Sequence, residues 1–234
     1  MGTRKFLVTA GNTREMIDHV RDWGNVFTGN TGYAIARALT ELGEVDLLTS
    51  NRTHVAQAAG DGVRASGFTS HAELKGALAA LMARDRYDAI FMTAAVADYR
   101  PAGVFEVVER TREDDGAETW RVRDVTAPKV RSHHGQIAVL GEPTEKIVDL
   151  FRAAWGHAGL LFKFKLEVGI EPEELLRIGR ASRVASGANY LVANTLAMVE
   201  GENAGAYLIS DAGEEFVPRG SLAPRLVQAV RTHF

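Results

Sequence analysis

The clearest structural signal in the chain is KFLVTAGNTRE, residues 5–15, followed by GNTG at residues 29–32. A short apolar run rich in β-branched residues predicts a buried strand, and the glycine after it predicts a tight turn. The pair Gly29 and Gly32 opens a segment with helical periodicity. A strand, a glycine turn and a helix in this order predict the first unit of a parallel sheet, whose ligands lie at the carboxyl ends of its strands.

The same alternation of short apolar runs and longer helical patterns continues along the chain. We expect strands at residues 5–9, 45–49, 89–93, 159–164 and 190–193, helices at 31–42, 72–83, 145–155 and 172–186, then a hairpin over 206–209 and 215–217 and a helix over 222–232. This order predicts an α/β, Rossmann-like fold with a mostly parallel, doubly wound sheet. We expect one domain over residues 1–234.

Residues 101–136 break this rhythm. Their charged tract, residues 109–118, predicts a solvated hairpin tip. Two interpretations stay open: a flap that closes over a reaction, or a surface hairpin with no catalytic part.

Composition limits the classes of function. The 27 Lys and Arg residues against 30 Asp and Glu give a net charge of -3, so no nucleic-acid partner is predicted. The absence of cysteine excludes disulfides, thiolate metal sites and a cysteine nucleophile, and it fits a reducing compartment, with the cytoplasm as the default. No apolar run reaches the roughly 20 residues that span a bilayer, so no membrane association is predicted.

No metal site of the protein itself is predicted either. The adjacent pair His133-His134 has no carboxylate at metal-ligand spacing, and neighbouring residues on a strand point to opposite faces.

Two strand ends carry candidate binding residues. The turn at Gly11 with Gly29 and Gly32 favours phosphate recognition, although the glycines can also serve only tight turns. It lacks the Gly-x-Gly-x-x-Gly and Walker patterns, which disfavours a nicotinamide-dependent dehydrogenase. The second strand end, TAAVADYRP at residues 93–101, has small side chains that let a ligand reach main-chain donors. There Asp98 is a candidate acceptor for ligand hydroxyls or amides, or alternatively a turn or N-cap residue.

Together these motifs resemble the phosphopantothenoylcysteine synthetase family. The matching stretches are TAGNTRE (9–15), Asn25, Gly29, GYA (32–34), AAVADYRP (94–101), KVRS (129–132), EPT (142–144), FKLE (164–167) and VAN (192–194). They follow the family order from Phe6 to about Ile209. The resemblance implies a ligase that joins 4'-phosphopantothenate to cysteine through an acyl nucleotide in coenzyme A biosynthesis, with CTP or ATP as co-substrate.

The resemblance also implies roles for individual residues. Asn25 would hold the phosphopantothenate and its acyl nucleotide, and Lys129 would stabilise charge as that intermediate forms. Arg21 is expected to reach the phosphate of a substrate in a neighbouring subunit, because the family is dimeric. The expected substrate-binding residues are Arg21, Gly29, Gly32, Ala94, Ala95 and Asp98. The expected nucleotide-binding residues are Gly11, Met92, Thr93, Ala94, Asp98, Lys129, Pro143, Thr144, Glu145, Lys146, Phe164 and Arg180.

Mg²⁺ is implied by the triphosphate, and no flavin is expected because the synthetase-like pattern begins at Phe6. Two departures from the family leave questions open. FTGN at residues 27–30 replaces Ser-Ser-Gly-Lys, and Ser182 and Ser186 stand where bacterial members carry lysines, so that Arg180 or Arg183 would have to supply the charge. The alternatives are a divergent relative that ligates a different acid and amine, and a nucleotide-binding module without turnover.

Overall fold

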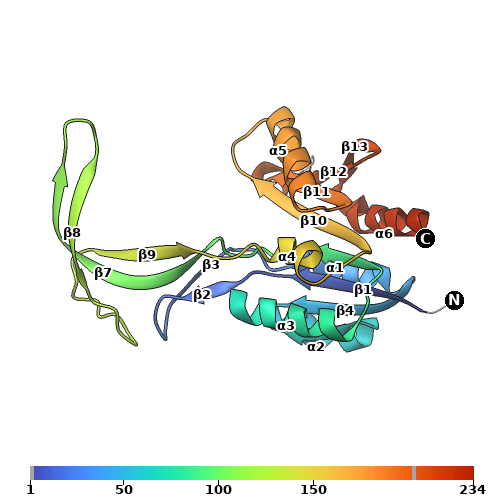
Figure 1. The fold of residues 1–234 in the computed structure, drawn as a ribbon, viewed down its shortest axis with the longest axis horizontal. Coiled ribbons are helices and arrows are strands. Elements are labelled where there is room, and N and C mark those ends of the chain that lie inside the picture. Colours follow the sequence, from blue (N-terminus) through green and yellow to red (C-terminus); the bar gives the residue numbers. More distant parts are fainter. Residues whose placement is uncertain (1–2, 202–203) are drawn as a thin grey trace.

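The computed structural model describes residues 3–201 and 204–234, and within them eight strands form the main sheet (Figure 1). The strands are β1 (Arg4–Ala10), β4 (Gly43–Thr49), β5 (Arg64–Gly67), β6 (Ala89–Met92), β10 (Leu160–Glu167), β11 (Tyr190–Thr195), β12 (Gly205–Ser210) and β13 (Gly213–Pro218). Their order is β13-β12-β11-β10-β6-β1-β4-β5. The six strands from β5 to β11 pair in parallel, and β12 and β13 pair antiparallel at one edge. The prediction of a mostly parallel, doubly wound sheet is confirmed.

Helices cover both faces of this sheet. One face carries α1 (Asn30–Leu39), α2 (Arg52–Ala58) and α6 (Leu222–His233), and the other carries α3 (His71–Arg84), α4 (Ile147–Ala153) and α5 (Pro172–Ala185). Alternate residues of β1 serve the two layers, since Phe6 and Val8 pack with α1 and α6 while Leu7 packs with α3 and α4. A parallel strand buried on both faces must be apolar at successive positions, which is why the strands appear as continuous apolar runs.

Several short elements were not predicted. They are the strands β2 (Arg14–Met16) and β3 (Asp22–Gly24), which pair with each other, helix α2, strand β5, and the 3-10 helices Ala59–Asp61, Leu196–Met198 and Arg219–Ser221. No described helix is long and apolar enough to cross a membrane. The single-domain assignment stays a prediction.

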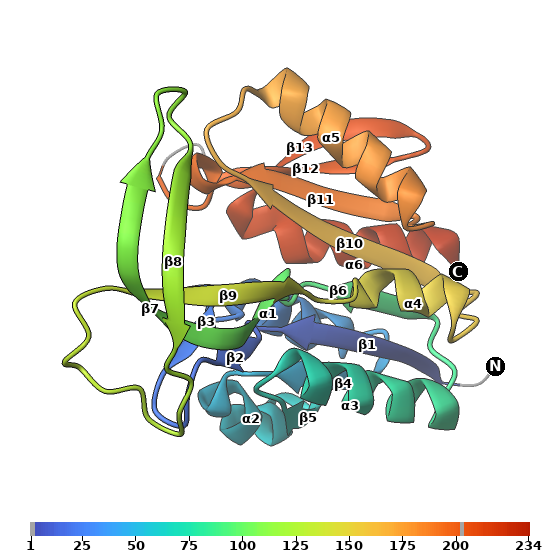
Figure 2. The same ribbon diagram turned by 60° about the vertical axis from the view of Figure 1, so that its left-hand side comes forward.

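A three-stranded arm projects from the carboxyl end of the main sheet (Figure 1). It consists of β7 (Tyr99–Arg112), β8 (Glu118–Asp124) and β9 (Ile137–Pro143), in the order β8-β7-β9. Figure 2 shows β7 and β8 standing upright beside the carboxyl ends of the main-sheet strands, with the loop between β8 and β9 beside β2 and β3. The predicted excursion at residues 101–136 is therefore real but longer at both ends. We call residues 99–143 the arm.

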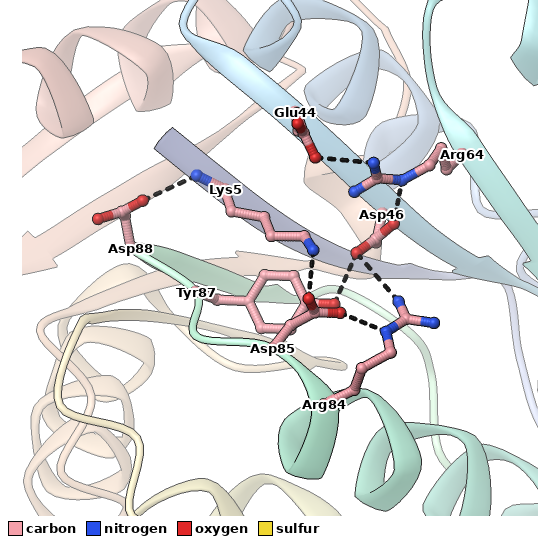
Figure 3. Close-up of polar contacts among 8 residues, drawn as sticks. All are labelled: Lys5, Glu44, Asp46, Arg64, Arg84, Asp85, Tyr87 and Asp88. Carbon is pink, nitrogen blue, oxygen red and sulfur yellow. Dashed lines mark hydrogen bonds and ion pairs between the residues drawn. The ribbon is translucent and has the colours of Figure 1, made fainter. Parts of the chain in front are cut away.

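The amino ends of the strands are held by a network of charged side chains (Figure 3). This amino-edge cluster consists of Lys5, Glu44, Asp46, Arg64, Arg84, Asp85, Tyr87 and Asp88. Its centre is the buried carboxylate of Asp46, which accepts hydrogen bonds from the Tyr87 hydroxyl at 2.6 Å and from Arg64 Nε at 2.8 Å. Burial and the bond to Asp46 raise the pKa of Tyr87. The cluster joins β1, β4, β5 and the segment before β6, at the edge opposite to the arm.

Candidate active site

A cleft of about 1060 Å³ lies at the carboxyl ends of β1, β6, β10 and β11. Gly11 follows β1, residues 92–98 follow or end β6, Phe164 lies on β10, and Asn194 lies on β11. The strand order reverses between β1 and β6, because β4 and β5 lie on one side and β10 and β11 on the other. In doubly wound sheets this switch point is where ligands bind. The carboxyl-edge location predicted from the sequence is therefore where the cleft lies.

Two glycine turns bring the start of α1 against the end of β1. Gly11 and Gly29 have φ of 85° and 83°, and a Cβ on Gly29 would stand 2.3 Å from the Gly11 nitrogen. A Cβ on Gly32 would lie 2.3 Å from Thr93 Oγ1, so this contact also requires glycine. The first N–H groups of a helix have no partner within the helix. Here the first helical residues line the cleft, so the glycines form tight turns and place a helix start at the cleft, while phosphate recognition stays a prediction.

Asn25 lines the cleft and is held from two sides. Its side-chain Nδ2 donates to the backbone carbonyl of Ala95 at 3.3 Å, and its backbone carbonyl accepts from the side-chain amide of Asn12. Asn12 is fixed in turn, because its backbone N–H donates to Ser50 Oγ at 2.9 Å. Asn12 has no positive φ, so it acts through its side chain and not through a glycine-like backbone. Sequence reasoning missed this positioning role, although an amide directly after a strand-ending glycine was the available signal.

The segment that carries Asp98 is fixed by its backbone. The hydroxyl of Thr144 donates to the Ala97 carbonyl at 2.5 Å, and the Thr144 N–H donates to the Asp98 carbonyl at 2.9 Å. The Ala97 N–H donates to Thr13 Oγ1 at 2.8 Å. Within residues 3–201 and 204–234 the exposed carboxylate of Asp98 accepts no hydrogen bond and caps no helix, and it borders the cleft. This placement argues against the N-cap interpretation, and the acceptor and turn interpretations both stay predictions.

The structure brings most of the sequence-predicted site residues together. The cleft is bordered by Gly11, Asn25, Gly29, Gly32, Met92, Thr93, Ala94, Ala95, Asp98, Thr144, Glu145, Lys146 and Phe164. Four predicted residues lie outside its lining: Arg21, Lys129, Pro143 and Arg180. Pro143 ends β9 directly before Thr144, and Arg180 on α5 binds Glu214 of β13, with Nη2 to Oε2 at 3.0 Å.

Arg21 contacts the loop that carries Lys129. We call this loop, residues 125–136 between β8 and β9, the docked loop. The buried carboxylate of Asp18 accepts from the Val130 N–H at 3.1 Å, and Arg21 Nη2 donates both to Asp18 at 2.5 Å and to the Val130 carbonyl at 2.6 Å. Arg21 and the backbone N–H groups hold the pKa of Asp18 well below its ordinary value. The loop is thereby tied to the turn between β2 and β3, and Lys129 is exposed on it.

Other residues that line the cleft were not among the predicted site residues, although Ser182 and Asn194 lie in stretches that the family comparison used. They are chiefly Lys163 on β10, Ser182 on α5, Asn194 on β11, residues 196–200, and Arg219. Lys163 is half-buried, burial lowers its pKa, and its ammonium donates to the Ser182 carbonyl at 3.3 Å. A charge inside an apolar strand pattern was the signal that could have marked it.

The histidine pair of the arm departs from expectation. His133 and His134 lie in a loop and not on a strand, and their rings are 4.2 Å apart, so the opposite-face argument was wrong. A carboxylate is also present, because His134 Nδ1 lies 3.2 Å from Glu106. In the part of the chain that the structure describes, no group of three or more His, Asp or Glu side chains is placed to hold a metal ion.

A doubly wound sheet with a glycine-lined cleft at its switch point is typical of α/β proteins that bind a ligand at the carboxyl ends of the strands. The family model described as "DNA/pantothenate metabolism flavoprotein C-terminal domain" matches residues 1–119, and the chain belongs to this family. The family resemblance inferred from the motifs is confirmed.

Relatives in other organisms extend the match. The chain is 33% identical over 240 residues to the coenzyme A biosynthesis bifunctional protein CoaBC of Mycobacterium tuberculosis, covering 98% of this chain and 52% of that protein. It is 29% identical over 194 residues to the CoaBC of Thermococcus kodakarensis, covering 82% of this chain and 41% of that protein. The chain thus spans about half the length of these curated relatives.

Solved structures share the fold. The DNA/pantothenate metabolism flavoprotein of Streptococcus pneumoniae superposes with a TM-score of 0.79 at 21% identity, covering 100% of both chains. A Cab2 variant in complex with phosphopantothenate-cysteine superposes with a TM-score of 0.69 at 13% identity, covering 98% of this chain and 87% of the other.

Proposed function

We propose that this chain is a nucleotide-dependent ligase that joins 4'-phosphopantothenate to cysteine through an acyl-nucleotide intermediate, a step of coenzyme A biosynthesis. The observation that carries the proposal is the single cleft bordered by Asn25, Asp98 and Phe164 in a member of a pantothenate-metabolism family. Two findings on other proteins support it: the CoaBC relatives are coenzyme A biosynthesis proteins, and the Cab2 structure contains phosphopantothenate-cysteine.

The proposed reaction has two steps. A carboxylate oxygen of phosphopantothenate attacks the α-phosphorus of the triphosphate, the bond to the bridging oxygen breaks, and pyrophosphate leaves. The cysteine amine then attacks the acyl carbon, the nucleoside monophosphate leaves with the bonding electron pair, and the amine loses a proton to give the amide. Neither step needs a protein nucleophile or an electron transfer, so no flavin takes part. The protein acts by positioning the reactants and neutralising phosphate charge.

The site residues suit these tasks. The start of α1 offers backbone N–H groups to phosphate oxygens, and the fixed amide of Asn25 offers a donor to the acyl nucleotide. Lys129 would stabilise the charge that develops as the acyl nucleotide forms. Because Lys129 lies outside the cleft lining, its action requires the arm to move or a second subunit to present it.

Mg²⁺ is expected to enter with the triphosphate and to supply charge neutralisation at the phosphates. The hard oxygen ligand that Mg²⁺ prefers is available in the Asp98 carboxylate, which is exposed at the cleft and accepts no hydrogen bond within the described residues.

The enzyme is proposed to act as a homodimer in the cytoplasm. The support for the dimer is the family resemblance, and the arm leaves about half of the surface of Tyr99 (52%), Trp120 (48%) and Leu140 (52%) exposed. Arg21, exposed beside the docked loop, remains the residue proposed to reach a neighbouring subunit's substrate. Light scattering during size-exclusion chromatography, on the wild-type protein and on Trp120→Glu, tests the dimer; a wild-type mass of one chain would refute it.

Pyrophosphate release tests the activity directly. The assay would combine the four common nucleoside triphosphates with phosphopantothenate and several other acids, with cysteine as the amine. Release that requires phosphopantothenate supports the proposal and identifies the preferred base, CTP or ATP. Release with a different acid would contradict the proposal and favour the alternative of a divergent ligase, which is compatible with the different sequence at Phe27–Asn30. Nucleotide binding without release would replace it by a module without turnover.

A further inference from the structure

The ammonium of Lys163 is an unpaired cation inside the cleft. Its side chain is half-buried and lines the cleft between α4 and α5, and it donates to the backbone carbonyl of Ser182 at 3.3 Å. Within residues 3–201 and 204–234, Lys163 forms no ion pair, whereas Lys165, two positions along the same strand, binds Glu167 at 2.9 Å. One neutral carbonyl leaves most of the hydrogen-bonding capacity of an ammonium group unused.

The surroundings of Lys163 are unfavourable for a cation. Burial lowers its pKa, and the neighbouring charges of Lys146 and Lys165 act in the same direction, while only Asp149 opposes them. Removing a charged group from water without a compensating partner is costly. An anion in this part of the cleft would supply the missing partner.

The other cations near α5 are already paired. Arg180 binds Glu214, with Nη2 to Oε2 at 3.0 Å. Arg183 binds Asp211 at 2.5 Å and donates to the carbonyls of Ala188 and Asn189 at 3.3 and 3.2 Å. Arg180 and Arg183 do not line the cleft, so neither supplies its charge.

We propose that Lys163 is a phosphate-binding residue that holds the part of the nucleoside triphosphate that leaves as pyrophosphate. This inference rests on the proposed function. Asn25 and Asp98, which are proposed to hold the acid, lie before α1 and after β6, whereas Lys163 lies on β10, the strand next to β6, and its ammonium faces α5. The terminal phosphates carry most of the triphosphate charge. Among the lysines that line the cleft, Lys163 is the half-buried one without an ion pair within the described residues, since Lys146 is exposed and Lys165 binds Glu167.

Titration calorimetry in the presence of Mg²⁺ tests this assignment. For Lys163→Met, the Kd of the preferred triphosphate is expected to rise by about tenfold or more, which corresponds to losing about one charge-assisted hydrogen bond. The Kd of the matching monophosphate should change by less than about threefold on the same scale. Lys165→Met is the matched control, and because its cation is already paired with Glu167, its effect should be clearly smaller.

A relocated charge gives a second, independent measurement. The Lys163 ammonium lies against the backbone of Ser182, so the double variant Lys163→Ala/Ser182→Lys brings a cation into the same region from α5. It should regain triphosphate affinity relative to Lys163→Ala. Thermal unfolding of each variant identifies those that fail to fold. If Lys163→Met fails to fold, Lys163→Gln, which also removes the charge, takes its place, and Lys163→Arg, which keeps the charge, should retain most of the triphosphate affinity.

The possible failures are distinguishable. An unchanged triphosphate Kd in Lys163→Met, or an equal loss for mono- and triphosphate, would overturn the role of Lys163 while the ligase could still turn over. Conversely, if Lys163→Met loses triphosphate affinity but the wild-type protein releases no pyrophosphate with phosphopantothenate, the phosphate site stands and the proposed ligase does not.

Discussion

The main sheet holds its polar groups in opposite ways at the amino ends of its strands, here called the amino edge, and at their carboxyl ends, the carboxyl edge. At the amino edge, Asp46, Arg64, Tyr87 and their neighbours bind one another across four segments of the chain (Figure 3). At the carboxyl edge, the Asp98 carboxylate, the Lys163 ammonium and the first N–H groups of α1 face a cleft.

This difference indicates that the amino edge contributes to the stability of the fold, whereas the carboxyl edge is available to bind a ligand. A buried charge with hydrogen-bonded partners fixes the ends of strands, and removing one partner leaves the other buried and uncompensated. A polar group left without a protein partner is available to a ligand and does not stabilise the fold, and where it is half-buried, as Lys163 is, its desolvation costs stability. Substitutions at the carboxyl ends of the strands should therefore change turnover without lowering stability, and those at the amino ends should do the reverse.

The largest effect is expected for Lys129→Ala. Loss of a cation that stabilises the developing phosphate charge should lower pyrophosphate release about 10²- to 10³-fold. The thermal midpoint should not change, because the Lys129 side chain is exposed. Arg131→Ala, on the same loop, is the control and should retain activity. Normal turnover in Lys129→Ala would remove this residue from the mechanism.

A smaller loss is expected for Asn25→Ala. Without the amide, product formation should slow about 10- to 100-fold while the acyl nucleotide persists, because the first step does not depend on this donor. Single-turnover quenching with chromatographic detection of the intermediate measures both quantities. Asn12→Ala removes the side chain that holds Asn25 in place and should give a weaker version of the same pattern. If the intermediate also disappears, Asn25 acts in the first step.

Asp46→Asn tests the opposite edge. Its side chain is 7% exposed and serves Tyr87 and Arg64 together, so the variant should lose about 2–3 kcal/mol of unfolding free energy in urea. Glu44→Gln is matched to it, because Glu44 binds the same arginine at 2.7 Å but is 49% exposed, and it should lose less than about 1 kcal/mol. The kcat/KM of both variants should equal that of the wild type. A fall in kcat/KM with stability intact would break the comparison between the edges.

The sequence was sufficient for the long elements and for the location of the cleft. Apolar strands and helices of ten or more residues repeat their pattern often enough to be recognised, and one rule about carboxyl ends places Gly11 and Asp98 together, whereas the family resemblance was needed to place Asn25 with them. Several short elements escape this reasoning: α2 has seven residues, and β2 and β3 have three each, although α4, also of seven residues, was predicted. Such lengths give too few turns or alternations to establish a period.

Contacts between segments that lie far apart in the sequence could not be predicted. The docked loop depends on Asp18 meeting Val130 across 112 positions, and no local pattern announces that pair. The interpretation of residues 159–164 as an ordinary apolar strand likewise concealed Lys163, whose importance appears only once α4 and α5 are seen beside it.

The smallest effect is expected for Asp85→Asn, and it depends on pH. The Lys5 ammonium, with Arg84, lowers the pKa of Asp85 in the folded protein. A lowered folded-state pKa adds stability above the unfolded value of about 3.9, and this contribution is lost as the pH falls through the folded-state value. Urea unfolding from pH 7 to pH 3 should therefore show that the free energy of unfolding of the wild type exceeds that of Asp85→Asn by an amount that falls below about pH 4. A difference in unfolding free energy that stays constant across this range would mean that the ion pair is not its source. Pyrophosphate release at pH 7 should be the same in both proteins, since the Asp85 carboxylate lies at the amino edge, away from the cleft. If Asp85→Asn lost activity as well as stability, the two edges would be coupled.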